Sequence, residues 1–384
     1  MLARPNAPFA ELSPVAHGAL DHGELARLGI SPESVVDFSS SINPYGPALV
    51  VEQAAREAAI ERYPDKECRE LRLALAEYLD VDELSVALGN GSAELIDHLA
   101  RIYLSTSDTA LIVGPTFGEY ERVSRLCGAQ LLYWNREVLD SEVTFDLEEL
   151  VCTVERERPR VIWLCNPNNP TGDCLRRGAI ERLLEATASI EGLLILDEAY
   201  RDLMLEEEPE DLTDLLSGGN LVLLRSMTKS HALAGLRLGY VLAAPPIIRA
   251  LAVARPPWNV SAPAQVAGTA ALTAPALEHL ENSRQRMSRT AAYLRKEFTD
   301  LGYEVPTGIT NFLLAKVGDA ARLRRKLLRQ SLQVRDCASF GLPEYVRIAV
   351  RRPEECRRLV SELRLSGVEK TGRGGEYRSP ATPT

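Results

Sequence analysis

Short apolar runs alternate with amphipathic stretches between about residue 50 and about residue 258, and this alternation restricts the possible folds more than any other feature. The apolar runs are only a few residues long, which predicts strands that are buried on both faces. The clearest are Ala110–Val113, Val161–Leu164, Leu193–Leu196 and Leu221–Leu224. The stretch from Gly178 to Ala188 carries its apolar residues on one side and predicts a helix. Together they predict an α/β fold of three layers, with a mostly parallel sheet between helices.

The alternation stops at the segment Pro256-Pro257-Trp258-Asn259. A long helical stretch, roughly Ala262 to Leu301, follows and precedes short strand-like runs, which predicts a smaller α+β domain. The N-terminal residues are rich in Pro, Gly and Ser and predict an arm, whereas polar residues from Ser366 onward predict disorder. We expect an arm over 1–47, a large domain over 48–258, a small C-terminal domain over 259–365 and a tail over 366–384.

Composition excludes several classes of function. The net charge of −10 over 384 residues argues against a nucleic-acid partner, because a phosphate backbone requires a basic protein face. The seven cysteines are scattered without a C-x-x-C pair, which predicts free thiols in a reducing compartment and no metal site. We find no leader and no apolar run of membrane-spanning length, so we expect no membrane partner and a cytoplasmic location.

Three polar segments each follow directly after a predicted buried strand. They are Cys165–Gly172, Asp197–Tyr200 and Arg225–Lys229. In open α/β sheets the active site lies at the carboxyl ends of the strands, so three such segments at one end predict a shared pocket.

Lys229 is the first candidate catalytic residue in this pocket. It is one of only six lysines, and it stands at the end of an apolar run among small and hydroxylated residues. A lysine in a fixed position can form a Schiff base with an aldehyde. Ser226, Thr228 and Arg237 are residue types that bind a phosphate dianion. Together they predict pyridoxal phosphate, and the alternative is a solvated lysine in a loop.

Asp197 stands at the end of an apolar strand, where a buried carboxylate requires a cationic partner. A pyridinium nitrogen is such a partner, and the carboxylate would keep that nitrogen protonated. The alternative is that Asp197 caps a helix. Asn169 and Tyr200 can reach the 3′ oxygen of the cofactor, although Asn169 is equally suited to stabilise its own turn.

The segment Gly89–Glu94 precedes a helical pattern and would present free N–H groups to an anion. Ser92 and Ala93 would then hold the cofactor phosphate together with Ser226 and Arg237. Phe117 is placed to stack on an aromatic ring, although packing in the core is the commoner role of a Phe.

These motifs, in this order, resemble those of the fold-type I pyridoxal-phosphate enzymes of the class I/II aminotransferase group. The run S-x-T-K-x-x-A-L-x-G-x-R-x-G contains Lys229, and N-P-x-N-P-T-G and D-E-A-Y lie upstream. The resemblance implies an aspartate-aminotransferase-like fold, with Lys229, Asp197 and Tyr200 as catalytic residues. It also implies a homodimer in which Tyr63 binds the cofactor phosphate of the neighbouring subunit.

Within that group the chain resembles the branch of threonine-phosphate decarboxylases and histidinol-phosphate aminotransferases. The likeness rests on His17-Gly18, on Asp37–Gly46 and on Val346–Arg351. It implies that Arg347 binds the substrate α-carboxylate, for which a guanidinium fork is suited. The other substrate-binding candidates are Arg351 and His17 for a phosphate, with surface charges as the alternative, and Asn43 and Ser41.

The sequence departs from the decarboxylase pattern, because Leu20 and Ser41 replace two asparagines and Tyr200 is more usual in aminotransferases. Even so, the closer match predicts a lyase that decarboxylates a phosphorylated amino acid such as threonine phosphate, in cobamide (cobalamin) synthesis. The alternative is an aminotransferase acting on histidinol phosphate or another amino acid. Lys229, Asp197 and Arg347 argue against a third reading, a non-catalytic scaffold.

Overall fold

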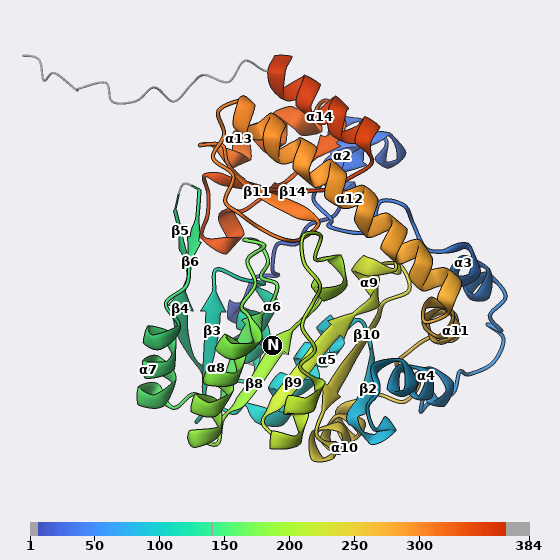
Figure 1. Ribbon diagram of the computed structural model, residues 1–384, viewed down its shortest axis with the longest axis vertical. Coiled ribbons are helices and arrows are strands. Elements are labelled where there is room, and N and C mark those ends of the chain that lie inside the picture. Colours follow the sequence, from blue (N-terminus) through green and yellow to red (C-terminus); the bar gives the residue numbers. More distant parts are fainter. Residues whose placement is uncertain (1–6, 140, 366–384) are drawn as a thin grey trace, which may run out of the picture.

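The computed structural model describes residues 7–139 and 141–365. A seven-stranded sheet forms the centre of the larger part of the molecule (Figure 1), with strand order β2-β10-β9-β8-β7-β3-β4. Only β10 runs antiparallel to its neighbours β2 and β9, and the other pairings are parallel. The predicted mostly parallel sheet is therefore confirmed. The strands are β2 (Val86–Asn90), β3 (Thr109–Gly114), β4 (Gln130–Asn135), β7 (Val161–Cys165), β8 (Leu193–Asp197), β9 (Leu221–Ser226) and β10 (Leu238–Ala243).

Helices cover both faces of this sheet. Successive apolar side chains along each strand point to opposite faces, so both faces must be buried. On β3, Leu111 packs in a core with α4, α7, α8 and α11, whereas Ile112 packs in a second core with α5, α6 and α10. The first group is α4 (Arg69–Leu79), α7 (Leu147–Glu157), α8 (Arg177–Ser189) and α11 (Ala262–Ala271). The second is α5 (Ser92–Tyr103), α6 (Glu119–Leu126) and α10 (Pro245–Ala254).

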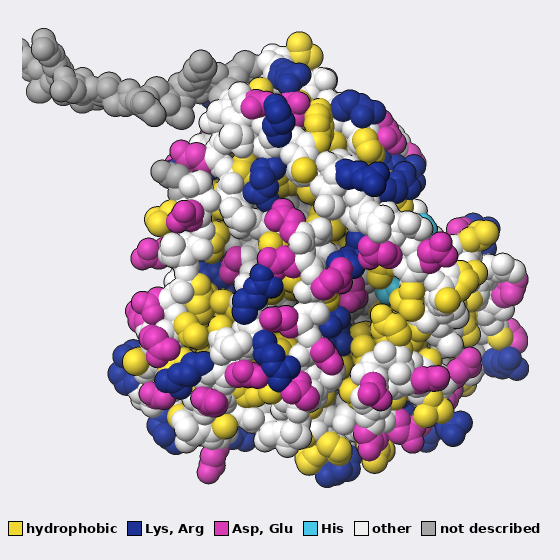
Figure 2. Space-filling view, viewed as in Figure 1, with side chains coloured by type: hydrophobic (Ala, Val, Ile, Leu, Met, Phe, Trp, Pro, Cys, Tyr) yellow, Lys and Arg dark blue, Asp and Glu magenta, His cyan; other side chains and the backbone are white. Residues whose placement is uncertain are grey.

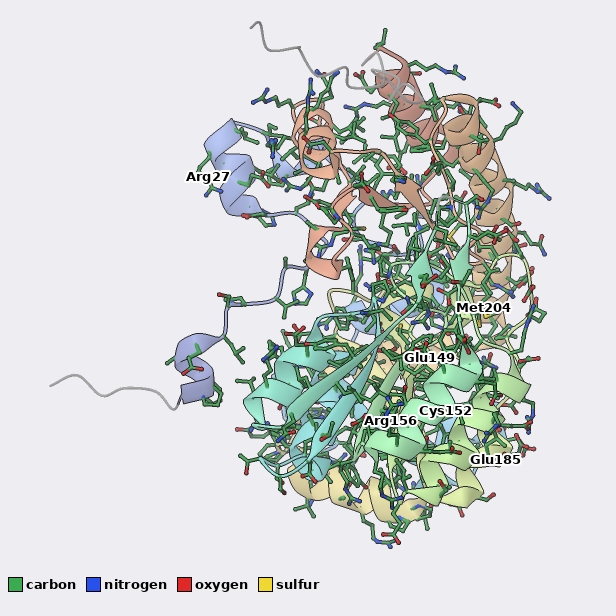
Figure 3. All side chains as sticks on the ribbon, turned by 90° about the vertical axis from the view of Figure 1, so that its left-hand side faces the viewer. Arg27, Glu149, Cys152, Arg156, Glu185 and Met204 are labelled. Carbon is green, nitrogen blue, oxygen red and sulfur yellow. The ribbon has the colours of Figure 1, made fainter. Side chains whose placement is uncertain are left out.

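Helix α7 shows how the sequence forms these outer layers. Its N-terminus is capped by Asp146, whose carboxylate accepts a hydrogen bond from the Glu149 backbone N–H at 2.9 Å. Leu150 and Val154 are buried against the sheet. Glu149, Cys152 and Arg156 are labelled on the opposite, solvent-facing side (Figure 3). Cys152 is thus an exposed thiol on an amphipathic helix.

The C-terminal part contains a second, antiparallel sheet with the order β11-β14-β13. It packs on helices through a separate core that includes Phe298, Ile348 and Leu359. In Figure 1 this part lies above the carboxyl ends of the parallel strands. Its elements are β11 (Phe312–Lys316), β12 (Leu332–Gln333), β13 (Arg335–Asp336), β14 (Tyr345–Ala349), α12 (Ala274–Asp300), α13 (Ala320–Leu328) and α14 (Pro353–Leu365).

The stretch predicted as one helix from Ala262 to Leu301 is two helices, α11 and α12, separated at Leu272 and Thr273. Pro275 explains the break. Proline has no N–H to donate and clashes with the preceding turn, so it is tolerated in the first turn of a helix but not in its interior. It lies in the first turn of α12.

The segment predicted as an N-terminal arm is partly built into the C-terminal sheet layer. Strand β1 (Val36–Asp37) pairs in parallel with β12, and Phe38 is fully buried in the C-terminal core. This region also contains α1 (Ala7–Glu11) and α2 (His22–Leu28), and α3 (Leu49–Arg56) follows it. The domain boundaries stay predictions, and the tail predicted over 366–384 lies outside the described residues.

The remaining elements are the short hairpin β5 (Glu137–Val138) and β6 (Val143–Thr144), the single-turn helix α9 (Met227–Ser230) and five 3₁₀ turns. On the face shown in Figure 2, acidic and basic side chains are interspersed rather than segregated. Within residues 7–139 and 141–365, no helix has the length and apolarity needed to cross a membrane.

Candidate active site

A cavity of about 400 Å³ lies where the strand ends of the large sheet face the C-terminal part of the chain. Four regions far apart in sequence form its walls: the N-terminal segment, the start of α5 and α6, the loops after β7 to β9, and the β13–β14 region. Its polar, charged and aromatic lining residues are His17, Ser39, Ser40, Phe117, Glu119, Asn169, Tyr200, Lys229, Arg237, Arg335, Ser339, Phe340 and Arg347.

The three polar segments that follow buried strands meet here, as the parallel topology requires. Strands β7, β8 and β9 are neighbours, and Cys165 at the end of β7 is level with Asp197 at the end of β8. As a result, Asn169, Tyr200 and Lys229 all line the same cavity.

Lys229 does not end the strand, as the sequence suggested, because β9 stops at Ser226 and Lys229 lies within the one-turn helix α9. The Ser226 hydroxyl caps this turn by accepting from the Thr228 backbone N–H at 3.3 Å. Asn43 braces the turn from the other side: its N–H donates to the Lys229 carbonyl at 2.9 Å, and its side-chain amide donates to the Ser230 carbonyl at 3.1 Å. The position of the Lys229 backbone is therefore fixed.

Asp197 is 4% exposed and each of its carboxylate oxygens accepts one hydrogen bond. The Tyr120 hydroxyl donates to Oδ2 at 2.7 Å, and the Ala199 N–H donates to Oδ1 at 2.9 Å. Burial raises the pKa of Asp197 to about 6, although these hydrogen bonds and the Lys229 charge oppose the shift. A carboxylate has about four lone-pair sites, so a further donor such as a pyridinium N–H can be accommodated.

An anion cradle lies at the N-terminus of α5, where backbone N–H groups are free to bind a ligand. Gly91 has φ +78°, and a Cβ there would approach within 2.6 Å of the Arg237 guanidinium, so only glycine leaves the space open. Ala93 and Arg237 line the cavity. The Ser226 and Thr228 hydroxyls lie 2.7 Å apart at the end of β9. Helix N-terminus, guanidinium and hydroxyls form a donor set that fits a phosphate.

Phe117 lies in the cavity wall beside His17, with the two ring centroids 5.6 Å apart. The His17 Nε2 atom is 3.0 Å from Glu119 Oε1, and Arg122 also donates to this carboxylate at 2.6 Å. Burial alone would raise the pKa of Glu119, but the hydrogen bonds from His17 and Arg122 outweigh it, and the pKa is lowered. An ionised Glu119 thus ties the N-terminal segment to α6 over the cavity.

Arg347 is buried on β14 and donates to the Asn169 side-chain oxygen and, at 2.7 Å, to the Ser39 carbonyl. Its Nε atom is buried and has no partner among the described residues. Arg335 lies directly opposite Arg347 in the β13–β14 register. It donates to the Ala16 carbonyl and the Ser339 hydroxyl, both at 2.7 Å. Burial and the charge of Arg347 lower the pKa of Arg335.

Sequence reasoning missed Arg335, Ser339 and Phe340. Arg335 carries no motif of its own, and only the cross-strand register places it beside Arg347. The sequence shows only that Arg335 lies shortly before the strand that carries Arg347. An arginine on the protein surface would look the same in the sequence.

Several predicted site residues do not line the cavity. Arg351 donates to Glu355 at 3.0 Å on the first turn of α14, so we leave it out of the proposed substrate site. Ser41 is fully buried, and its carbonyl accepts from the Asn311 side chain. Tyr63 is 76% exposed and stacks on Trp258, with ring centroids 4.4 Å apart. The others outside the lining are Ser92, Ser226, Asn43 and Asp197.

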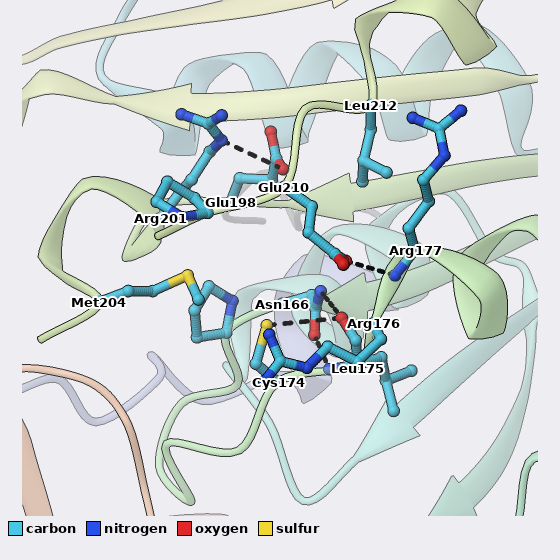
Figure 4. Close-up of a pocket in the computed structure, with 12 residues that line it drawn as sticks. Asn166, Cys174, Leu175, Arg176, Arg177, Glu198, Arg201, Met204, Glu210 and Leu212 are labelled. Atoms are coloured by element: carbon cyan, nitrogen blue, oxygen red, sulfur yellow. Dashed lines mark hydrogen bonds and ion pairs between the residues drawn. The ribbon is translucent and has the colours of Figure 1, made fainter. Parts of the chain in front are cut away.

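A second, much smaller cavity of about 20 Å³ lies beside the loops that follow β7 and β8 (Figure 4). Its carboxylates already have partners: the Arg177 backbone N–H donates to Glu210 at 2.5 Å, and Arg201 Nε lies 3.8 Å from Glu198. The space suits a water molecule rather than a substrate. The cavity that Asn169, Tyr200 and Lys229 line is the candidate active site.

The fold and the site define a pyridoxal-phosphate enzyme of fold type I. The chain matches the family "Aminotransferase class I and II" over residues 33–363, and it belongs to that family. It is 35% identical over 367 residues to histidinol-phosphate aminotransferase 2 of Pseudomonas aeruginosa, covering 94% of this chain and 96% of that one.

Solved structures agree on the fold. Histidinol-phosphate aminotransferase of Sinorhizobium meliloti, in complex with pyridoxal-5'-phosphate, matches with a TM-score of 0.85 at 22% identity, covering 96% of this chain and 99% of that one. The protein is thus a pyridoxal-phosphate-dependent aminotransferase. The cradle at Gly91, the buried carboxylate of Asp197 and Lys229 in the cavity fit that cofactor.

The prediction of a threonine-phosphate decarboxylase is wrong. Curated relatives that are 33–35% identical over most of the chain are histidinol-phosphate aminotransferases. L-threonine-O-3-phosphate decarboxylase of Porphyromonas gingivalis does share the fold, with a TM-score of 0.72 at 27% identity, covering 86% of this chain and 98% of that one. Both activities use one scaffold, so the N-terminal motifs that favoured decarboxylation did not distinguish them.

Proposed function

We propose that this aminotransferase acts on histidinol phosphate and passes the amino group to a 2-oxo acid. The main support is a pair of arginines, Arg335 and Arg347, that face the cavity from adjacent strands. The guanidinium group of Arg347 is buried and that of Arg335 is half-buried. An enzyme with these two substrates must bind a phosphate in one half-reaction and a carboxylate in the other. A guanidinium fork donates two parallel hydrogen bonds to either anion, which supports this dual use.

When bound, pyridoxal phosphate supplies the electron sink for the carbon that loses its proton. The amine of Lys229 would be the general base that takes the proton from the substrate Cα. Asp197 would hold the ring nitrogen protonated. The Asn169 oxygen accepts from Arg347, so its Nδ2 group would be free to donate to the 3′ oxygen, together with Tyr200. Phe117 would pack on the ring, and the groups around Gly91 would bind the phosphate.

The test is an assay of the purified protein with histidinol phosphate and 2-oxoglutarate, with glutamate formation as the measurement. We expect turnover in the wild type and none in Lys229→Ala. Absence of glutamate, alongside rapid transamination of an unphosphorylated amino acid, would overturn the substrate assignment and leave the aminotransferase class intact.

We also propose a homodimer. Exposed apolar side chains gather on the side of the molecule that carries α3 and α11 (Figure 2). Leu49 on α3 is 77% exposed and Ile60 is 83% exposed. Tyr63, which follows Ile60 closely in the sequence, stacks on Trp258, and both rings are exposed. Such a surface is suited to a second copy of the chain.

A cytoplasmic location stays a prediction that rests on seven free cysteines.

A further inference from the structure

Tyr120 is a buried phenol whose only polar atom contacts a catalytic carboxylate, and none of the sequence motifs assigned it a role. It lies on the first turn of α6, is completely buried, and donates its hydroxyl to Asp197 Oδ2 at 2.7 Å. Burial and the negative charge of Asp197 raise the pKa of Tyr120 well above its usual value. The phenol therefore keeps its proton and acts as a permanent donor to the carboxylate.

The ring of Tyr120 is held in place on two sides. It stacks on Trp163 of β7 with centroids 5.2 Å apart and an interplanar angle of 5°, and it meets Phe117 edge to face at 5.7 Å. Trp163 is in turn anchored, since its indole N–H donates to the Ser124 hydroxyl at 3.1 Å. A phenol packed this way cannot turn away from Asp197 without breaking two aromatic contacts.

The surroundings of Asp197 make this donor important. The titratable groups that face it are Tyr120, Cys165, Glu198 and Lys229. Burial raises the pKa of the Cys165 thiol, so Cys165 stays neutral, and its thiol is directed to the Pro167 carbonyl at 3.2 Å. Glu198 is paired with Arg225 at 2.7 Å. Two side chains favour the ionised form of Asp197, Lys229 through its charge and Tyr120 through a direct hydrogen bond.

We propose that Tyr120 is a positioning residue that holds the Asp197 carboxylate ionised and in a fixed orientation, and so sets how tightly the pyridine ring nitrogen of the cofactor is bound. The proposal rests on the role of Asp197 given above, and it is independent of which substrate the enzyme uses. Tyr120 also links Asp197 to Phe117, because its hydroxyl contacts the carboxylate and its ring contacts the Phe117 ring.

The test uses the full-length protein freed of cofactor and measures dissociation constants by quenching of tryptophan fluorescence. Tyr120→Phe removes the hydroxyl and keeps the aromatic stack. The matched control is Tyr303→Phe, which removes a hydroxyl from a tyrosine that packs on Phe298 in the other core. Each variant is titrated with pyridoxal phosphate and with a carbocyclic analogue in which C–H replaces the ring nitrogen.

We expect Tyr120→Phe to bind pyridoxal phosphate roughly tenfold to a hundredfold more weakly, the effect of losing a hydrogen bond to a charged group. Its affinity for the carbocyclic analogue should stay within about twofold of wild type, because that ligand makes no bond to Asp197. Equal weakening for both ligands, or no weakening beyond the Tyr303→Phe control, would overturn the proposal.

Asp197→Asn separates failure of this proposal from failure of the site assignment. If Asp197→Asn discriminates between the two ligands less than wild type does, Asp197 binds the ring nitrogen, and the Tyr120→Phe result then decides the proposal alone. If Asp197→Asn binds pyridoxal phosphate as tightly as wild type, the assignment of Asp197 is wrong and the proposal falls with it. Transamination of histidinol phosphate enters neither measurement.

Discussion

At the scale of single residues, the site depends on charges that are buried before any ligand arrives. Asp197 lies in an apolar strand end with two hydrogen bonds, and Arg347 lies beneath the cavity with its Nε unpartnered within the described part of the chain. A buried charge without its full set of partners destabilises the folded chain, and a ligand that supplies the missing partner recovers that free energy. The site is thus prepared for binding at the expense of stability.

Asp197 makes the stability of the cofactor-free protein depend on pH. Its folded-state pKa of about 6 lies above the ordinary value of 3.8, so the folded state holds this proton more tightly than the unfolded chain. The stabilisation is complete below about pH 4 and is lost as the pH rises to about 6, a change of about 3 kcal/mol. Asp197→Asn cannot titrate, so its free energy of unfolding should rise by that amount relative to wild type between pH 4 and pH 7. Urea denaturation would show this, and a difference that does not vary with pH would contradict it.

Arg335 should affect one substrate more than the other. Removal of a guanidinium that binds a phosphate costs about 1.5–3 kcal/mol, so Arg335→Gln should raise KM for histidinol phosphate roughly tenfold to a hundredfold. The KM for an unphosphorylated amino-acid donor should rise much less. Steady-state kinetics with both donors measure the ratio, and Arg357→Gln, an exposed position on α14, is the control. Equal effects on both donors would indicate that Arg335 only supports the N-terminal segment.

At the scale of elements, helix α8 was predictable because its apolar residues recur on one side of the helix. The four predicted strands β3, β7, β8 and β9 were found within two residues of their predicted bounds, since continuous apolar runs can only be buried in such a sheet. The long C-terminal helix was predicted as one because alanine and charged residues favour helix on both sides of Pro275. Local periodicity did not reveal that this proline starts a new helix.

The Asp146 cap of α7 provides a test at this scale. Asp146→Ala removes the acceptor for the Glu149 N–H and a negative charge at the positive end of the helix. We expect the free energy of unfolding to fall by about 1 kcal/mol, with kcat unchanged, because α7 lies on the outer layer away from the cavity. Asp146→Asn, which keeps the acceptor oxygen, should lose much less. A large change in kcat would show that α7 is coupled to the site.

At the scale of the whole molecule, the cavity exists only because segments far apart in the sequence come together around it. Residues 15–19, 39, 40 and 42 reach it from the N-terminal segment, the strand-end loops form its base, and Arg335 and Arg347 come from the C-terminal sheet. The pairing of β1 with β12, a separate two-stranded sheet, joins the N-terminal segment to the C-terminal part of the chain. The shape of the cavity therefore depends on the relative placement of the large sheet and the C-terminal part.

The proposed dimer should be disrupted at its exposed apolar surface. Ile60→Glu places a charge on a residue that is 83% exposed, which the isolated chain tolerates and an apolar interface does not. Light scattering coupled to size-exclusion chromatography should show the wild type as a dimer and this variant shifted toward monomer. Leu84→Glu, at an exposed leucine in the 3₁₀ turn before β2, is the control. A wild type that runs as a monomer would refute the dimer.

The sequence by itself determined the alternation of strands and helices, the end of the sheet at which chemistry occurs, and the cofactor. These follow from local patterns: apolar runs define buried strands, and the polar segment after each strand must lie at the same edge. The tertiary structure alone decided that Arg335 lies opposite Arg347, that Arg351 pairs with Glu355 instead of facing the cavity, and that Tyr120 contacts Asp197. Each of these depends on strand register or on the rotation of a helix about its axis. Local sequence constrains such quantities weakly, because they are set by packing between residues far apart in the chain.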